Sequence, residues 1–434
     1  MQFGQREDCV TQRRYALLFG RCDTRNGFKR PKTILSTDAT LDRVVLTRRR
    51  MFMKDALPPS VDVIVVGLGA MGSATCYQLA TRGHSVIGLD KFSSPHAMGS
   101  SHGKSRIIRE AYFENPLYVP LVQRAYASWN ALEKASGTAL FRQTGGLMLG
   151  PPDGALVRGA RLSAEMHGLP HEILSSDAVH VRFPVFMPTA DMVGVWEPRA
   201  GVLAPERAIA AALDVARRHG AQVRLNEPMV SWRAVDGGVE VTTATGMYRA
   251  RRLVLSLGAW MSDVVPELAL PLKVQRNVKY WFTPERCAAQ FTDAKFPVFI
   301  SEYAPNESWY GIPDSGEGLA LALHLNGEYT HPERLRREVA DAEVQVVRGL
   351  IARYLPDANG PLRETAVCMY TNTPDEHFIV DRHPAHAHVI LASPCSGHGF
   401  KFSSVLGEVL ADLATDRTPA FDLRPFRVTR FRVA

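Results

Sequence analysis

The pattern of apolar and polar positions is clearest in residues 61–90. Residues 61–66 are a nearly unbroken β-branched run, which predicts a strand buried on both faces of a parallel sheet. Residues 70–81 follow as a helical segment, and residues 85–89 form a second apolar strand that ends in Asp90. The order strand, helix, strand predicts a parallel α/β unit.

Patterned segments continue along the rest of the chain. Helices are predicted at residues 205–219 and 403–413, with one or two more in 333–354, and strands at residues 221–225, 274–282, 317–324 and 388–392. The alternating segments 274–282 and 317–324 predict a mixed sheet that covers the first unit. The length of 434 residues allows two or three such units.

The net charge of +7 is confined to the start of the chain. Residues 1–50 hold 12 Lys and Arg against 5 Asp and Glu, so the remainder is formally neutral. A neutral body lacks the basic footprint of a nucleic-acid binder. No apolar run approaches the roughly 18 residues of a membrane span, so we expect neither nucleic acid nor membrane as a partner.

Residues 1–53 have no sustained apolar period. They end in Arg48, Arg49 and Arg50, followed by Met51 and Met53. We interpret this segment as a disordered extension or as an upstream stretch included by a wrong start codon. A transit peptide is the alternative, but five acidic residues fit one poorly.

The cysteines are too scattered for a disulfide framework or a metal site. The six are Cys9, Cys22, Cys76, Cys287, Cys368 and Cys395, with no CxxC spacing. This usage predicts reduced thiols in a cytoplasmic protein without a bound metal.

Gly67, Gly69 and Gly72 form a GxGxxG motif between the first strand and the first helix. The first glycine permits a tight turn, the second lets backbone approach a pyrophosphate, and the third lets the helix pack on the strand. The helix N-terminus attracts the anion. Asp90, 18 residues after the last glycine, can accept a hydrogen bond from a ribose hydroxyl, which predicts NAD or FAD.

Two later segments carry further candidate chemistry. Arg106 and Arg109 lie three residues apart among apolar neighbours and would share one face of a helix. A partly buried arginine pair favours an anion such as a carboxylate or the flavin edge. Near the C-terminus, SGHGFKF precedes the helix predicted at 403–413 and repeats the strand, glycine turn, helix order. Lys401 in this turn is equally compatible with a surface and a buried position.

From about residue 61 to its end, the chain resembles the monomeric sarcosine oxidase and N-methyltryptophan oxidase family, flavin amine oxidases of the D-amino acid oxidase-like group. The resemblance is carried by VDVIVVGLGAMGS, PHAMGSSHGKSRIIREAY, GAW, CMYTNTPDEHFIVD and SGHGFKFSSVLGE. It implies an α/β fold with a Rossmann-like, glutathione reductase-like FAD-binding domain interleaved with a mixed-sheet α+β substrate domain. We expect the FAD domain at 54–142, 193–264 and 365–416, the substrate domain at 143–192 and 265–364, and a tail at 417–434.

The resemblance implies FAD-dependent oxidation of an N-methyl amino acid such as sarcosine or N-methyltryptophan. The products are the demethylated amino acid, formaldehyde and hydrogen peroxide. FAD is expected to be covalent, with the sulfur of Cys368 bonded to the 8α carbon of the ring, and Cys395 is the second candidate. A monomer is expected, with oxygen or another electron acceptor as the partner of the second half-reaction.

Site residues are carried over by matching motif positions. Catalytic roles fall to Arg106 and His102 beside the flavin ring and to His324 and Tyr310, substrate binding to Arg109, Lys401, Tyr370 and Tyr112, and cofactor binding to Gly67, Gly69, Gly72, Asp90, Cys368, Gly397 and Gly399. Arg109 and Lys401 match positions that bind the substrate carboxylate.

Ala320 departs from the family pattern. Family oxidases have a lysine four residues before the histidine that matches His324, where its charge helps oxygen accept an electron. Another cation, Lys279 or Arg276, could replace it. The alternative is a flavin dehydrogenase that uses another acceptor, acting on the same substrate or on a cyclic amino acid such as pipecolate or proline. An accessory or biosynthetic flavoprotein is a further alternative.

Overall fold

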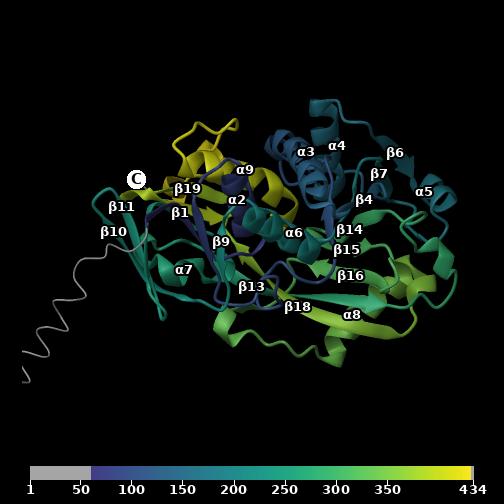
Figure 1. Cartoon of the computed structure of the whole chain (residues 1–434). Helices are drawn as coiled ribbons and strands as arrows, with labels where there is room; N and C mark the ends of the chain where they lie inside the picture. Colours follow the sequence, from purple (N-terminus) through teal and green to yellow (C-terminus); the bar gives the residue numbers. More distant parts are fainter. Residues whose placement is uncertain (1–59, 432–434) are drawn as a thin grey trace, which may run out of the picture. The chain divides into compact units, whose positions relative to one another are not determined.

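A computed structural model describes residues 60–431, and their strands form two large sheets and one small sheet (Figure 1). The prediction for residues 1–53, the first residues of the predicted FAD domain (54–59) and the end of the tail (432–434) lie outside the described residues. The predicted α/β class is confirmed, since helices and both parallel and antiparallel strands are present.

The first large sheet has β1 at its centre, hydrogen-bonded in parallel to β2 and β12. The order is β10-β11-β12-β1-β2-β9, and β20 adds to β12 in parallel and carries β19 at its edge. The strands are β1 (Ser60–Val66), β2 (Val86–Leu89), β9 (Gln222–Arg224), β10 (Met229–Val235), β11 (Gly238–Thr243), β12 (Met247–Leu255), β19 (Ile379–His383) and β20 (His386–Ser393). Both faces of β1 are buried, as its continuous apolar run predicted.

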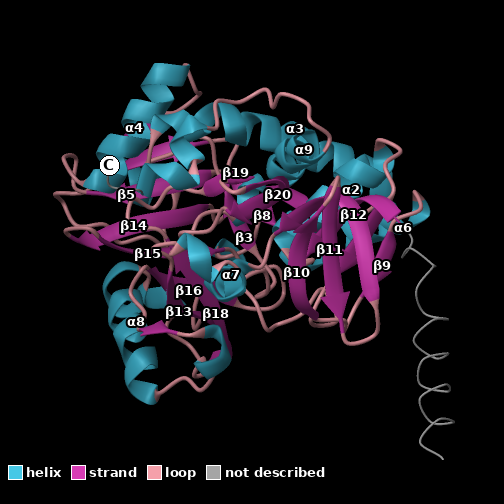
Figure 2. Cartoon of the chain, turned by 90° about the vertical axis from the view of Figure 1, so that its left-hand side faces the viewer, coloured by secondary structure: helices cyan, strands magenta, loops and turns pink. Residues whose placement is uncertain are grey.

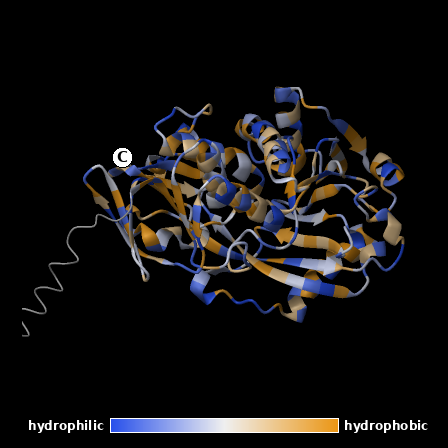
Figure 3. Ribbon diagram, viewed as in Figure 1, coloured by the Kyte–Doolittle hydropathy of each residue, from blue (hydrophilic) through white to orange (hydrophobic). Residues whose placement is uncertain are grey.

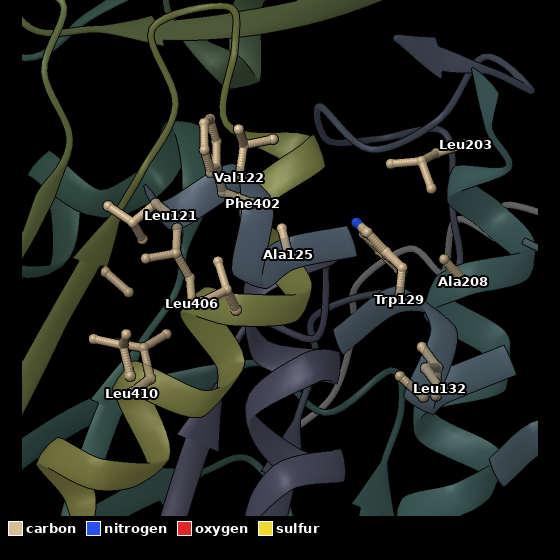
Figure 4. Packing of buried hydrophobic residues seen from close by; sticks show 14 of the residues in the cluster. Leu121, Val122, Ala125, Trp129, Leu132, Leu203, Ala208, Phe402, Leu406 and Leu410 are labelled. Atoms are coloured by element: carbon tan, nitrogen blue, oxygen red, sulfur yellow. The ribbon is translucent and has the colours of Figure 1, made fainter. Parts of the chain in front are cut away.

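Helices α2 (Ala70–Thr81), α3 (Val119–Ser136), α6 (Pro205–Arg218) and α9 (Ser403–Ala414) share the largest apolar core of the described chain. Figure 4 shows Leu121 and Ala125 of α3 beside Leu406 of α9 within it. Helices α2 and α9 approach closely because Gly407 of α9 has no side chain. A Cβ there would lie 2.7 Å from the backbone of Ala74 in α2. Burial of each large apolar side chain contributes about 1.5–3 kcal/mol.

The second large sheet is mixed and has the order β17-β13-β16-β15-β14-β5-β7-β6, with β18 on the other side of β13. Its strands are β5 (Gly146–Gly150), β6 (Glu172–Ser175), β7 (Val193–Glu197), β13 (Lys273–Phe282), β14 (Val298–Ala304), β15 (Glu307–Ile312), β16 (Leu319–His324), β17 (Tyr329–Thr330) and β18 (Leu362–Asn372). Helix α8 (Asp341–Tyr354) lies beside β13, β16 and β18, to their left in Figure 2.

The alternation along β13 and β16 assigns their two faces. Tyr280 and Phe282 pack with Leu321 and the helix α8 on one face. Side chains on the opposite face, such as Lys279, point the other way because successive strand residues alternate. Orange stretches in Figure 3 follow the strands of both large sheets, consistent with sheets buried in the interior.

The third sheet is small and consists of β3 (Arg106–Ile108), β8 (Gly201–Leu203) and β4 (Phe141–Gln143). Arg106 therefore lies on a strand and Arg109 follows it, so the helix on which they would have shared a face is absent. The remaining helices are α4 (Ala155–His167), α5 (Ser176–Arg182) and α7 (Met261–Val264). Within residues 60–431, no helix is both long and apolar enough to cross a membrane.

Two strands lie in a different sheet from the one their predicted domain implies. β7 and β18 belong to the second large sheet, although residues 193–264 and most of β18 were assigned to the FAD domain. Buried strands of either sheet have the same apolar pattern, so the sequence alone does not show which sheet they join. In the segment 333–354, the helix α8 begins only at Asp341, after the 3₁₀ turn Pro332–Arg334.

Candidate functional site

A cavity of about 490 Å³ is lined by residues of both large sheets and by most of the predicted site residues. Those that line it are Gly67, Gly69, Asp90, His102, Arg106, Arg109, Tyr310, His324, Cys368, Tyr370, Gly397, Gly399 and Lys401. Gly72 and Tyr112 do not line it and lie behind it.

The glycine motif forms one end of this cavity. Gly67 has a φ of 87°, and a Cβ there would lie 2.4 Å from the carbonyl oxygen of Ser256. A Cβ on Gly72 would lie 1.9 Å from the carbonyl oxygen of Gly67, so α2 packs against β1 only with glycine here. The N-cap residue Gly69 has no side chain to cap α2, and the N–H of Ala70 makes only a long hydrogen bond of 3.4 Å to Ser101 Oγ. This end of α2 is therefore suited to an anion.

Asp90 is fixed at the end of β2. Its carboxylate accepts hydrogen bonds from the backbone N–H groups of Leu68 and Phe92, each at 2.7 Å. Farther along the cavity, the ring nitrogen Nε2 of His102 is buried without a hydrogen-bond partner. These features fit FAD in order along the cavity. The N-terminus of α2 suits the pyrophosphate, Asp90 suits a ribose hydroxyl, and His102 Nε2 suits the ring.

The segment between β17 and α8 contacts residues at the end of the cavity near Asp90. Glu333 accepts hydrogen bonds from Lys91 Nζ at 2.6 Å and from Trp260 Nε1 at 2.7 Å. Arg337 donates to the carbonyl oxygen of Ala97 at 3.0 Å. The nucleotide end is thus held by residues far apart in the sequence.

The cavity face of the second sheet presents Cys368, Tyr370, His324 and Tyr310. Cys368 and Tyr370 are two residues apart on β18 and therefore share a face. The His324 ring centroid lies 5.8 Å from that of Tyr370 and 6.5 Å from that of Tyr310. Burial lowers the pKa of His324 to about 4 and raises the pKa of Tyr370 well above its usual value, so this wall is uncharged at neutral pH.

Cys368 pairs with Asn277 of β13 across the sheet. Burial raises the pKa of its thiol, while the positive charges of Arg106 and Lys279 act in the opposite direction. Cys395 also lines the cavity, but burial raises the pKa of its thiol to about 11. Among the described residues no charged group acts on the pKa of Cys395, so Cys368 has the more suitable surroundings for a thiolate.

Arg109 is buried and paired with a carboxylate. Its Nη2 lies 2.7 Å and 2.6 Å from the two carboxylate oxygens of Glu114, and its guanidinium lies 4.4 Å from the centroid of the Tyr112 ring. Burial alone would raise the pKa of Glu114, but the charges of Arg109 and Lys401 and the hydrogen bonds from Arg109 hold it at about 2. Glu114 lines the cavity and was not predicted, because nothing in its spacing from Arg109 indicates the contact.

Lys401 occupies a buried position in the turn before α9. Its Nζ donates to the carbonyl oxygen of His398 at 2.8 Å. Burial, together with the charge of Arg109, lowers the pKa of Lys401 to about 7. Of the two positions that the sequence left open for this lysine, the structure shows the buried one.

Tyr112 supports this end of the cavity from behind. Its hydroxyl lies 2.6 Å from His398 Nδ1, and His398 Nε2 lies 3.0 Å from the carbonyl oxygen of Glu376. A carbonyl only accepts, so Nε2 donates to it and Nδ1 accepts from Tyr112. His398, which sequence reasoning did not single out, lines the cavity and links Tyr112 to the turn that holds Lys401.

Arg106 is held by neutral acceptors. Its Nη atoms donate to the carbonyl oxygens of Ser105, Ser100 and His102 at 2.6–2.8 Å. The same loop is fixed by Glu206, whose carboxylate accepts from the N–H groups of Gly103 and Lys104. Burial and the neighbouring Arg106 charge lower the pKa of His102 to about 4.

The two cations considered as replacements at the Ala320 position lie on different faces of β13. Arg276 points away from the cavity and forms an ion pair with Glu343 at 2.5 Å. Lys279 lines the cavity, and its strand neighbour Trp281 pairs with Ala320. Only Lys279 of these two places a charge on the cavity face.

Known proteins resemble this chain over most of its length. Residues 62–413 match the family described as FAD dependent oxidoreductase. Monomeric sarcosine oxidase of Streptomyces avermitilis is 42% identical over 382 residues, which cover 87% of this chain and all of the relative. N-methyl-L-tryptophan oxidase of Salmonella newport is 36% identical over 372 residues, covering 85% and 99%.

A solved structure shows the same fold. NikD, an unusual amino acid oxidase essential for nikkomycin biosynthesis, superposes with a TM-score of 0.75 over 85% of this chain and 97% of its own. The sequence identity is 24%, so this likeness is evidence for the fold alone.

Proposed function

The chain belongs to the family of FAD-dependent oxidoreductases, and on this premise we propose that it oxidises an N-methyl amino acid such as sarcosine or N-methyltryptophan. The products are the demethylated amino acid, formaldehyde and hydrogen peroxide. The observation that carries the proposal is one cavity with a glycine-lined nucleotide end, the thiol Cys368, and the cations Arg109 and Lys401.

FAD is held through Gly67 and Gly69 at the N-terminus of α2, through Asp90, and through a covalent bond to Cys368. When bound, FAD supplies a two-electron acceptor for the hydride of the N-methyl carbon. Arg106 and His102 line the same cavity as Cys368. The charge of Arg106 acts on both Cys368 and His102, which supports the assignment of the two residues beside the ring.

Arg109 and Lys401 bind the substrate carboxylate. A charge-assisted hydrogen bond to arginine is among the stronger interactions available to a carboxylate. Because Glu114 already occupies Nη2 of Arg109, the substrate carboxylate competes with Glu114 or binds the remaining guanidinium and Lys401. Nε of Arg109 is buried without a hydrogen-bond partner and is free to donate.

Tyr310, His324 and Tyr370 form the wall against the amine and its methyl group. All three are neutral at neutral pH, and an uncharged, poorly hydrated wall favours the neutral amine over the ammonium. The site contains no strong base at this wall, so positioning and electrostatics account for the rate in this proposal.

Oxygen is the electron acceptor in the proposal. This choice is supported by the relatives, which are named as oxidases. A dehydrogenase remains the alternative, because Ala320 stands where family oxidases have a lysine and its charge is missing from the cavity face. Measuring the rate of reoxidation in air distinguishes the two. We further propose that the enzyme is a monomer in the cytoplasm. The four cysteines of the described residues are unpaired, in keeping with a reducing compartment.

The experiment uses purified full-length protein, with Cys368→Ala and the matched control Cys395→Ala. After acid denaturation, yellow colour is expected to stay with the wild-type precipitate and the Cys395→Ala precipitate, and to be released from Cys368→Ala. Release from all three proteins contradicts the Cys368 attachment.

The substrate is tested on native protein without oxygen. Sarcosine, N-methyltryptophan and pipecolate are added in turn, and the flavin absorbance is followed. Bleaching by one of the N-methyl amino acids and rapid recolouring in air are expected. Bleaching by pipecolate alone, or recolouring only with an artificial acceptor, supports the dehydrogenase alternative, and bleaching by none of the amines contradicts the proposed reaction.

A further inference from the structure

Lys279 is a buried lysine whose hydrogen-bond partners are all neutral. Burial, together with the charge of Arg106, holds the pKa of its ammonium well below the usual value, while Cys368 and the carboxylates of Glu206 and Glu317 act in the opposite direction. It is 4% exposed, and its Nζ donates to the carbonyl oxygens of Gly103 and Ser105 at 3.0 Å and to Ser105 Oγ at 2.7 Å. None of the ion pairs found among residues 60–431 includes Lys279. A buried ammonium without a directly paired carboxylate is costly, and such groups cluster at functional sites.

The strand register places this cation beside the thiol. Cys368 of β18 pairs with Asn277, and Lys279 is the next residue of β13 on the same face, paired with Ala366. Diagonal neighbours across antiparallel strands have Cα atoms about 7–8 Å apart, within reach of a long side chain. On the other side, Lys279 pairs with Ala322 of β16, so small side chains flank it on both strands.

Charged and titratable groups around Cys368 come from four elements. Arg106 of β3, and Lys279 of β13 when it is protonated, lower the pKa of the Cys368 thiol against the effect of burial. Tyr310 of β15 and Tyr370 of β18 also face Cys368, and burial keeps both phenols neutral. Among the described residues no carboxylate acts on the pKa of this thiol, so the local field favours an anion.

We propose that Lys279 stabilises the thiolate of Cys368 and thereby promotes formation of the bond between Cys368 Sγ and the 8α carbon of FAD. The proposal rests on the covalent attachment proposed above. Lys279 acts through Cys368 and is therefore a positioning residue. Lys104 differs because its charge is exposed and paired with Glu364, although its Nζ lies 5.2 Å from the same Trp281 ring that Lys279 approaches at 5.1 Å.

The bond-forming step balances with dioxygen as the oxidant. The thiol loses its proton and the 8-methyl group loses one proton, and one S–C bond forms in place of the S–H and C–H bonds. The two electrons released by this bond formation pass to dioxygen, which takes up two protons and becomes hydrogen peroxide.

The test measures covalent attachment rather than turnover. Full-length wild type, Lys279→Met, Lys279→Gln and the control Lys104→Met are incubated with FAD in air between pH 6 and pH 10. The covalent fraction is read by intact mass after denaturation. A cation at this range shifts a thiol pKa by about one unit, so we expect both Lys279 variants to attach FAD roughly tenfold more slowly at pH 7.5.

The pH profile separates charge from structure. Attachment in both Lys279 variants is expected to recover at a pH about one unit higher than in wild type, while Lys104→Met follows wild type. Lys279→Gln keeps a donor for the Gly103 and Ser105 carbonyls, so wild-type behaviour of this variant would mean a purely structural role and overturn the proposal. Thermal unfolding and noncovalent FAD binding, read by flavin fluorescence, identify a variant that does not fold, and Lys279→Gln then decides.

Failure of the attachment itself gives a different result. If wild type and Cys368→Ala both release all FAD, the covalent bond is absent and the proposal falls with its premise. If wild type retains FAD, Cys368→Ala releases it, and the Lys279 variants match wild type at every pH, only the role of Lys279 is overturned.

Discussion

Buried charges around the cavity are balanced in two different ways. At the carboxylate-binding end, Arg109 has a full countercharge in Glu114 at 2.6 Å. At the Cys368 end, Lys279 and Arg106 are held only by carbonyl and hydroxyl oxygens. A paired arginine can exchange one carboxylate for another, whereas unpaired cations remain available to an anion that arises during the chemistry. Similar burial therefore supports two different functions.

The same contrast exists between two buried carboxylates. Glu114 faces a guanidinium, and its pKa is held at about 2. Glu197 has no direct ion pair and accepts from the backbone N–H groups of Glu110 and Ala111, at 2.5 Å and 2.8 Å. Burial raises its pKa to about 7, although these hydrogen bonds and the more distant charge of Arg109 act in the opposite direction. Neutral hydrogen bonds do not replace a countercharge in a buried site.

The largest effect is expected from breaking the paired end. Arg109→Met leaves Glu114 buried without its partner, and loss of one member of such a pair costs about 3–5 kcal/mol in the free energy of unfolding. Urea denaturation of the FAD-loaded protein measures this loss. The double variant Arg109→Met/Glu114→Gln should recover part of it, and additive effects would show that the two residues are not coupled.

Glu197→Gln tests the buried carboxylate that has no direct ion pair. Its folded pKa of about 7 lies above the ordinary 4.5, so its contribution to stability is fully present below pH 4.5 and is lost as pH rises through 7. The difference in unfolding free energy between wild type and Glu197→Gln should fall by about 3 kcal/mol between pH 4.5 and pH 8. Denaturation of both proteins across this range measures the difference, and a constant value would contradict the assignment.

Lys401 sharpens the comparison within the carboxylate-binding end. Its pKa of about 7 means that the free enzyme loses this charge as pH rises through 7. The affinity for acetate, a carboxylate without an amine, should therefore fall about tenfold per pH unit above 7, toward a plateau set by Arg109. Perturbation of the flavin spectrum reports binding, and Lys401→Met should bind weakly with no dependence on pH in this range.

The smallest effect is expected at the exposed pair of Lys104 and Glu364, whose side chains are 33% and 48% exposed. Ion pairs of this kind contribute about 0–1 kcal/mol. Lys104→Met should thus leave the thermal unfolding temperature nearly unchanged. A loss as large as that of Arg109→Met would show that exposure does not separate the two classes of charge.

Local sequence was sufficient where one element forms a part of the site. The helix predicted at residues 70–81 is α2, and the glycines that let it pack follow from their own spacing. Arg106 and Arg109 would have shared a face if their segment were helical, yet β3 contains the first of them and pairs with β8.

Contacts between elements far apart in the chain could not be predicted from the sequence. Lys279 was one of two candidate cations, and only the register of β13 against β16 and β18 shows that it faces the cavity while Arg276 does not. Glu114 was missed because its role depends on the loop between β3 and α3. The sheet that β7 and β18 join could not be predicted either, since strand pairing is not encoded in the apolar pattern of one strand.

The strand β20 has a consequence for the order in which the protein is made. A ribosome releases the glycine loop early, but β12 lacks its parallel neighbour until residues 386–393 have emerged. Tyr112 and Lys401, which meet at the carboxylate-binding end, are synthesised 289 residues apart. The nascent chain therefore contains the glycine loop long before the cofactor site is complete. A stop codon anywhere before β20 abolishes the enzyme instead of weakening it.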